Sequence, residues 1–459
     1  MREATATWVA AAWRAGALVL GLLAGGLAIA LDVKIVAALA LGTVFVVALR
    51  RVWLEPKLGL YLAVVAFSLD SLGKLPLTDQ FPITLYQITI AVTLAGALRD
   101  HVSGVRSLRW KATRLDLPIL FFVVLAVLVA GLAPNLRLSL VTLASLLSSV
   151  VLFYLILVMI DTPEEARRLL LWLLGVATVL AVLAITERMT GVSIAGNVTK
   201  SYTAGIRIRG SFKDPNIFGM LLMTALVSSF ALVLGEKGLT RRRMAQAMAV
   251  VFVALVLTFS RGAWLAFAAG AAAIVLAYPG DRMRRIVPLG MAFAVAALLV
   301  LNLTPPEFVQ TKILRLSQDT STLARIYMLK SGVQMVAANP IGAGLAAFPT
   351  AYAAYRYGSV KPELIQSHTA YLTIAVEMGL AGLGLFLLLL FRFLSTTWPD
   401  IRSGGRNLST RLELAATAAV LGILVQAWFY SVELSKQLWF CMGLAVAAQL
   451  AASRKEAND

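Results

Sequence analysis

The chain has 459 residues, of which 60% are hydrophobic and only 14% are charged, whereas about a quarter of residues are charged in a soluble domain. Its net charge of +18 is spread over short segments between apolar runs, which argues against a nucleic-acid partner. The single cysteine, Cys441, excludes an intramolecular disulfide and a cysteine-based metal site. The composition therefore predicts an integral membrane protein.

Apolar runs that approach the length needed to cross a bilayer, about 20 residues, recur along the whole chain. They predict an all-α fold, a polytopic transmembrane helical bundle of 12–14 spans, with twelve if one hairpin is re-entrant or peripheral. No small-residue cleavage site follows the first run, so we expect no cleaved signal peptide. The predicted spans are 15–31, 35–49, 58–72, 83–98, 115–132, 138–160, 168–186, 216–234, 244–259, 262–278, 285–303, 369–394, 411–431 and 436–452.

Basic residues fall in alternate loops, and short Lys/Arg-rich loops stay in the cytoplasm. This pattern predicts that both termini are cytoplasmic and that two larger segments, about 187–215 and 304–368, lie outside. We therefore divide the chain into an N-terminal part of the bundle (1–303), a helical loop (304–368) and C-terminal transmembrane helices (369–459). The basic clusters include Arg50-Arg51, Arg241 to Arg243, Arg282 to Arg285 and Arg402 to Arg411.

The segment 304–368 has its own helical pattern. Apolar residues at helical spacing predict a helix over Thr322–Ala338, which Asn339-Pro340 ends. A glycine-containing turn follows, and then a second, aromatic helix with Phe348, Tyr352 and Tyr355. These helices suit the membrane interface, and they also fit a purely structural cap on the bundle. The two interpretations are compatible.

Five of the arginines on the predicted outer side are candidates for a functional role, because arginine is unusual there. Arg261 is the most telling, because it separates two apolar runs, and arginine near bilayer depth is costly unless it faces a cavity or a partner. The alternative is an arginine that reaches the interface from a helix end. The five are Arg207, Arg209, Arg261, Arg325 and Arg356.

The residues just before the span 216–234 indicate a fixed turn. Gly210 and Pro215-Asn216 favour the turn, Lys213 adds positive charge, and Asp214 or Asn216 can cap the following helix. Guanidinium groups bind phosphate oxygens in a bidentate manner, so several of them on one face suit a diphosphate.

His368 is the leading candidate for a catalytic base. The chain has two histidines, and the other, His101, lies in a basic patch without further signs of chemistry. His368 follows the long outer loop and is the only histidine on the predicted outer face. Imidazole is the side chain best suited to proton transfer near neutral pH.

Several kinds of chemistry lack their sequence signals. The outer segments hold no Asp-x-Asp pair for Mg²⁺, and the chain has no phosphate-binding loop for ATP and no serine-hydrolase elbow. We therefore predict a site without metal or cofactor, built from one histidine and several arginines.

Four short motifs occur in one order and carry a resemblance. They are Arg209-Gly210-Ser211-Phe212 with Pro215-Asn216, then Ser260-Arg261-Gly262, then Asn339 to Gly344, and finally Ser367 to Leu372. This set resembles the O-antigen ligase family, within the superfamily of O-antigen polymerases and ligases. The motifs cover roughly residues 200–390, and the hydropathy of the whole chain is similar. Many members have Asn after the histidine, where this chain has Thr369.

The resemblance implies a glycosyltransferase in the bacterial inner membrane, with its site facing the periplasm and the 304–368 segment as a periplasmic loop. It implies transfer of a glycan from undecaprenyl diphosphate to lipid A-core oligosaccharide. His368 would act as base, with Arg209 and Arg261 on the departing diphosphate. Without a second nucleophile, one inverting displacement is expected. Predicted substrate-binding residues are Arg207, Lys213, Asn216, Arg325, Arg356 and Tyr371.

Three alternatives share much of this sequence evidence. A polymerase would join repeat units on the same carrier, and a protein O-oligosaccharyltransferase would use a periplasmic serine as acceptor. A transporter of lipid-linked sugars would grip the diphosphate without a base, and it predicts charges along a path through the bundle. The inner halves of the predicted spans hold few charges. The main ones are Asp70 and Glu377, with Glu433 just before the last span, and this scarcity favours an enzyme.

Overall fold

The fold is all-α, as predicted, with one short β ladder. The structure, a computed structural model, describes residues 33–69, 74–75, 83–105, 108, 111–191, 207–277, 290–291, 293–294, 297, 320–356, 367–401, 407–431 and 435–458. Strands β1 (Lys74–Leu75) and β2 (Ile83–Thr84) pair antiparallel, with Lys74 opposite Thr84. The remaining regular structure is helical.

The helices of the described residues follow one another in chain order. They are α2 (Val33–Leu54), α3 (Leu58–Ser68), α4 (Leu85–Val102), α5 (Asp116–Gly131), α6 (Leu136–Met159), α7 (Pro163–Thr190), α8 (Pro215–Val233), α9 (Gly238–Leu257), α10 (Arg261–Ala277), α13 (Thr320–Ala338), α14 (Phe348–Tyr352), the 3₁₀ helix η4 (Ala353–Tyr355), α15 (Ala370–Ile401), α16 (Leu408–Gln426) and α17 (Lys436–Asn458).

Twelve of the fourteen predicted spans coincide with a helix, and the other two, 15–31 and 285–303, fall wholly or largely outside the described residues. Within the described part, five helices are long and apolar enough to cross a membrane: α6, α7, α8, α15 and α16. Helices α3, α5 and α10 are apolar but shorter. The protein is therefore a multi-pass membrane protein.

Local sequence explains where two of the long helices begin. The Thr162 side chain accepts a hydrogen bond from the Glu165 amide at the start of α7, and Pro163 occupies the first turn. Asp214 caps α8 in the same way, by accepting from the amide of Asn216, and Pro215 follows it. The predicted capping role of Asp214 is confirmed.

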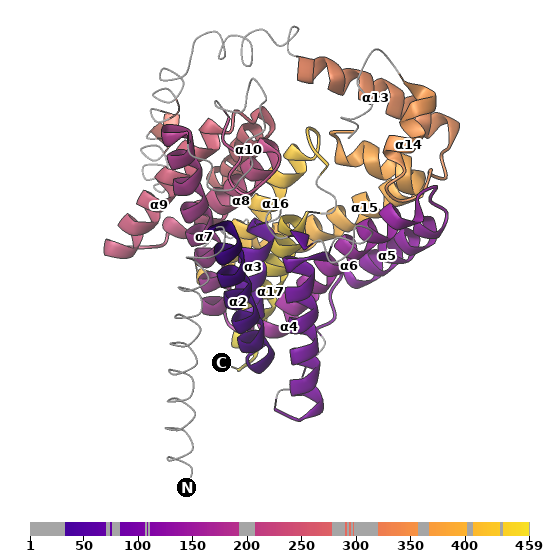
Figure 1. The fold of residues 1–459 in the computed structure, drawn as a ribbon. Coiled ribbons are helices and arrows are strands. Elements are labelled where there is room, and N and C mark those ends of the chain that lie inside the picture. Colours follow the sequence, from indigo (N-terminus) through magenta and orange to yellow (C-terminus); the bar gives the residue numbers. More distant parts are fainter. Residues whose placement is uncertain are drawn as a thin grey trace.

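Helix α16 lies in the centre of the bundle and packs against α8, α10 and α17 (Figure 1). Close packing is possible because small residues face one another: a Cβ at Gly270 would lie 2.9 Å from the Ala418 carbonyl oxygen. At the same interface between α10 and α16, a Cβ at Gly422 would lie 2.8 Å from the Ala266 carbonyl oxygen. This packing brings the starts of α8 and α10 to the end of α16.

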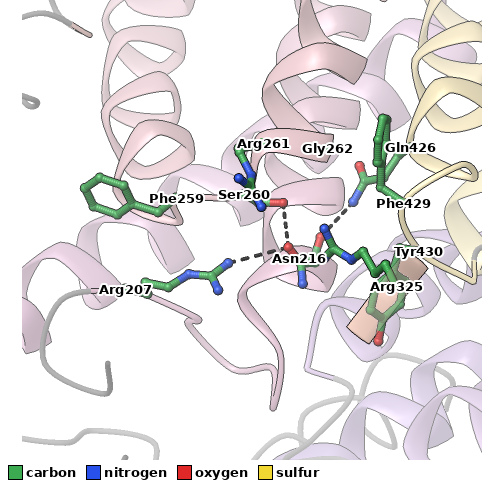
Figure 2. Close-up of a pocket in the computed structure, with 10 residues that line it drawn as sticks. All are labelled: Arg207, Asn216, Phe259, Ser260, Arg261, Gly262, Arg325, Gln426, Phe429 and Tyr430. Carbon is green, nitrogen blue, oxygen red and sulfur yellow. Dashed lines mark hydrogen bonds between the residues drawn. The ribbon is translucent and has the colours of Figure 1, made fainter. Parts of the chain in front are cut away.

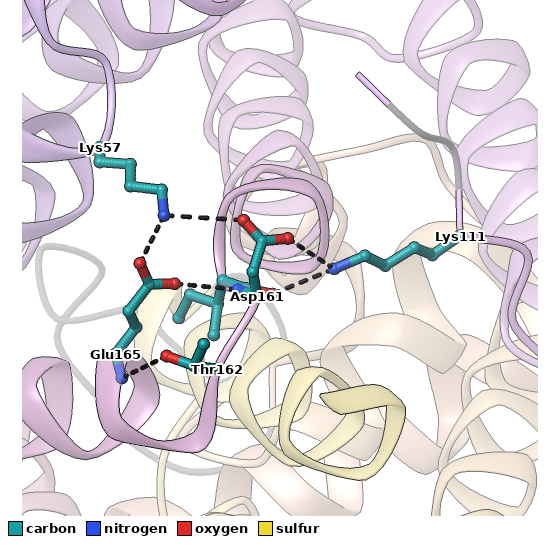
Figure 3. Close-up of polar contacts among 6 residues, drawn as sticks. Lys57, Lys111, Asp161, Thr162 and Glu165 are labelled. Carbon is teal, nitrogen blue, oxygen red and sulfur yellow. Dashed lines mark hydrogen bonds and ion pairs between the residues drawn. The ribbon is translucent and has the colours of Figure 1, made fainter. Parts of the chain in front are cut away.

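Polar contacts join the starts of α3 and α7 to the segment before α5 (Figure 3). The Lys57 ammonium pairs with Glu165 and lies 3.6 Å from Asp161. Lys111 donates to the Ile160 carbonyl oxygen at 3.0 Å and lies 3.8 Å from the same Asp161. Because the Asp161 carboxylate is partly exposed, these pairs contribute modestly to stability and mainly fix geometry.

The loop helices pack against the first part of α15. Helix α13 confirms the predicted helix, beginning two residues earlier than expected, and α14 with η4 confirms the aromatic one. A second, smaller apolar cluster joins them to α15 and consists of Met328, Met335, Phe348, Tyr352, Leu372 and Val376. The boundaries proposed at 303 and 368 stay predictions.

Candidate active site

Four segments that are distant in sequence meet in one small pocket (Figure 2). They are the turn before α8, the turn between α9 and α10, the first half of α13, and the C-terminal end of α16. The lining residues are Arg207, Asn216, Phe259, Ser260, Arg261, Gly262, Arg325, Gln426, Phe429 and Tyr430.

Asn216 connects three of these segments. Its side-chain oxygen accepts from the Ser260 hydroxyl at 2.8 Å and from Arg207 Nη2 at 3.5 Å (Figure 2). Its side-chain nitrogen donates to Asp214 at 2.8 Å, and its backbone carbonyl accepts from the Gln426 amide at 2.9 Å. Asn216 therefore helps to hold the pocket together, and its predicted contact with substrate stays a prediction.

Arg207 and Arg261 come together because two turns are joined. Arg207 Nε donates to the Thr258 carbonyl oxygen at 2.8 Å, and the Ile208 amide donates to the Leu257 carbonyl oxygen at 3.1 Å. The chain then reverses through Phe259, whose φ of 49° is unusual for a residue other than glycine. Arg261 begins α10 directly after this turn.

Helix α13 supplies a third guanidinium, from Arg325 (Figure 2). Arg207, Arg261 and Arg325 are all partly buried, and none of the ten lining residues is a carboxylate. Positive charge in a concave, partly desolvated setting attracts anions and strengthens each contact with them. The pocket is therefore chemically suited to a phosphate or diphosphate group.

His368 lies beside this pocket. Its ring centroid is 6.1 Å from that of Tyr430, a lining residue. Its Nδ1 atom is buried and has no hydrogen-bond partner within the part of the chain that the structure describes. Its φ of 53° is in the left-handed region, which is strained for histidine and recurs at functional sites. The Nδ1 nitrogen of His368 is thus not engaged by the surrounding protein, and the role of His368 as a base stays a prediction.

Contacts with the end of α16 fix the segment that carries His368. The Ala370 amide donates to the Ala427 carbonyl oxygen at 2.8 Å. The Thr369 hydroxyl donates to the Trp428 carbonyl oxygen at 3.3 Å. Thr369, the residue directly after the histidine, is thus held against the C-terminal end of α16.

The surroundings keep the His368 imidazole neutral. Burial lowers the pKa of His368, and the positive charge of Arg325 lowers this pKa further. The Asp214 carboxylate opposes both effects by raising the pKa. Because the lowering influences dominate, the ring is uncharged at neutral pH and able to accept a proton.

Besides His368, which lies beside the pocket, four predicted residues do not line it. Arg209 is partly buried two residues after Arg207, whereas Lys213 and Arg356 are exposed. The Tyr371 hydroxyl donates to the Leu424 carbonyl oxygen at 3.0 Å, and its ring packs on Trp428. Their proposed contacts with substrate stay predictions.

The sequence analysis did not identify the contribution of α16. Gln426, Phe429 and Tyr430 line the pocket, and Gln426 is 1% exposed with an unpartnered side-chain oxygen among the described residues. One signal was present: Gln426 is an amide within the apolar second half of the predicted span 411–431, where a polar residue is costly and often functional.

Part of the chain matches a known protein family. Residues 246–387 match a family model described as O-antigen ligase. The matched region contains Arg261, Arg325 and His368, while Arg207 and Asn216 precede it. No curated protein matches the chain. The match covers less than half of this multi-pass membrane protein, and it supports a similarity to the O-antigen ligase family.

Proposed function

We propose that the protein transfers a glycan from undecaprenyl diphosphate to lipid A-core oligosaccharide, at the periplasmic face of the bacterial inner membrane. The observation that best supports this proposal is that Arg207, Arg261 and Arg325 line one pocket. A neutral His368 lies beside that pocket. Guanidinium groups supply an anion site, and the histidine supplies a base at its edge. The family match supports this class of reaction.

On the donor side, the guanidinium groups hold the diphosphate and stabilise the charge that grows as it departs. Fixed donors in a partly desolvated pocket stabilise developing charge better than water does, because they need little reorganisation. Arg261 and Arg325 are the main candidates from the pocket geometry. Arg209 is a further candidate through its closeness in sequence to Arg207.

On the acceptor side, His368 takes the proton of the attacking hydroxyl. The hydroxyl oxygen forms a bond to the anomeric carbon, and the bond from that carbon to the phosphate oxygen breaks. The electron pair of the broken bond leaves with undecaprenyl diphosphate, and the proton remains on His368. A single displacement of this kind inverts the anomeric configuration.

Deletion of the gene tests the acceptor. Under our proposal, lipopolysaccharide loses its O-antigen but keeps a complete core, and the lipid-linked glycan accumulates. Loss of long chains with retention of one repeat unit on the core would instead identify a polymerase. Loss of glycan from periplasmic proteins, with normal lipopolysaccharide, would identify a protein O-oligosaccharyltransferase.

The pH dependence of transfer should report the pKa of His368. The neutral form of a base is required, so kcat/KM falls as pH drops through the pKa of the free enzyme. Because the His368 pKa is lowered, the midpoint of this fall is expected below the ordinary histidine value of about 6.5. Arg325→Gln should move the midpoint upward, since it removes a positive charge that lowers this pKa. A midpoint above about 7, or a fall toward high pH instead, would contradict the assignment.

Metal independence is a separate expectation of the proposal. Among the described residues, no group of three or more His, Cys, Asp or Glu side chains is placed to bind a metal ion. The proposal assigns the balance of the diphosphate charge to guanidinium groups. Purified protein should transfer glycan in excess EDTA at nearly the rate seen with added Mg²⁺. Activity that disappears in chelator and returns with Mg²⁺ or Mn²⁺ would refute this expectation.

A further inference from the structure

A buried carboxylate outside the pocket holds the loop helices to α15. Glu377 is 7% exposed, and each of its carboxylate oxygens accepts a backbone hydrogen bond. Oε2 accepts from the Ala346 amide at 2.8 Å, and Oε1 accepts from the Phe348 amide at 3.2 Å. Burial of a carboxylate is costly unless its hydrogen bonds are satisfied, so packing alone does not explain a glutamate here.

Backbone bonds reinforce this junction. Helix α15 is interrupted at Gly379, which has φ 72° and ψ −177°, so carbonyl groups in the preceding turn are open to other partners. The Ala343 amide donates to the Val376 carbonyl oxygen at 2.8 Å, and the Gly344 amide donates to that of Glu377 at 3.0 Å. The Leu380 amide donates to the Pro340 carbonyl oxygen at 2.9 Å.

Only glycine fits at two positions of the junction. Gly342 has φ 106°, and a Cβ there would collide with the backbone nitrogen of Gly379. A Cβ at Gly379 would collide with the Ile341 carbonyl oxygen. The segment that follows α13 is therefore seated directly against the interruption in α15.

This junction determines the orientation of α13 relative to α15. Helix α13 ends at Ala338, immediately before the junction, and its Gly332 packs tightly on Leu372 of α15. Arg325 lies in the first half of α13, roughly 20 Å from the junction at 1.5 Å per residue. His368 lies two residues before α15 begins. A small rotation of α13 at the junction therefore moves Arg325 away from His368 and out of the pocket.

We propose that Glu377 is a positioning residue: it holds the segment after α13 so that Arg325 faces the donor diphosphate while His368 faces the acceptor. This inference rests on the proposed function of the Arg325 pocket. It also gives a role to the Asn339 to Gly344 motif, whose backbone supplies three of the bonds at the junction. Glu377 does not line the pocket, and the proposal gives it no direct contact with either substrate.

A double-mutant cycle tests the proposal. Glu377→Gln keeps the side-chain size but places an amide N–H opposite a backbone donor, so it should lower kcat/KM for the donor about tenfold. Arg325→Lys should also lower it about tenfold, through loss of the bidentate contact. Both changes remove the same contact. The kcat/KM of the double variant should therefore be no lower than that of the less active single variant.

The matched control is Glu413→Gln, the same change at a glutamate that is 2% exposed in α16. Its effect, whatever its size, should multiply with that of Arg325→Lys. If the effects of Glu377→Gln and Arg325→Lys also multiply, Glu377 is only a stabilising residue and the positioning role is wrong.

A distance measurement separates failure of this inference from failure of the proposed function. Spin labels are attached at Ile326 on α13, next to Arg325, and at Ser395 on α15, both exposed, in a Cys441→Ser background. Glu377→Gln should broaden or lengthen the single narrow distance seen without it, and Glu413→Gln should not. An unchanged distance overturns the inference. If the distance changes as expected but the protein without the Glu377→Gln change transfers no glycan, the positioning of α13 by Glu377 stands and the proposed function is overturned.

Discussion

Replacement of His368 by alanine is expected to lower glycan transfer by at least about a hundredfold, within the usual range for loss of a general base. The buried, unpartnered Nδ1 and the lowered pKa of His368 both fit a group that accepts a proton from substrate. Donor binding should be retained, because the guanidinium groups of the pocket are unchanged. The measurement is kcat with purified protein, together with the affinity for the lipid-linked donor.

His101→Ala is the matched control. His101 is exposed, and its Nδ1 accepts a hydrogen bond from the Leu108 amide at 3.2 Å, next to the C-terminal end of α4. This variant should transfer glycan at the wild-type rate. Full activity in His368→Ala would show that the base is another group. Asp214 would then be tested next, although its carboxylate already caps α8 and accepts from Asn216.

Arg261→Lys is expected to lower kcat/KM about tenfold to a hundredfold, even though the charge is kept. Lysine is a point charge without the planar fork that contacts two phosphate oxygens at once. Arg261 begins α10 at the pocket wall, so a shorter reach is not compensated by movement of the backbone. Arg261→Ala should be more severe. Steady-state kinetics with varied donor concentration measures both variants.

Arg242→Lys is the corresponding control, since Arg242 is exposed near the start of α9 and does not line the pocket. It should leave transfer unchanged. Wild-type kinetics in Arg261→Lys would reduce this arginine to a role in topology or packing. The same comparison at Arg209, which lies outside the pocket lining, decides whether that residue contacts the donor at all.

Properties that depend on neighbouring residues were readable from the sequence. Apolar runs located twelve described helices, because hydropathy and helical spacing are local properties. The same reasoning predicted the α13 helix, the aromatic helix that follows it and the capping of α8 by Asp214. The scarcity of histidine singled out His368, and arginine between two apolar runs singled out Arg261, because an isolated charge at that depth needs a reason.

The convergence of residues was decided by tertiary packing alone. Gln426 bonds to Asn216 across 210 residues of sequence, and it does so because small residues let α16 approach α8 and α10 closely. Packing also places Arg325 in the pocket while Lys213 remains exposed, a difference that charge alone does not reveal. The role of Glu377 depends on an interrupted helix and a seated loop, whose hydrogen bonds join residues about thirty positions apart. The sequence by itself thus determined the membrane helices and the chemical inventory, whereas the geometry that joins them came from long-range packing.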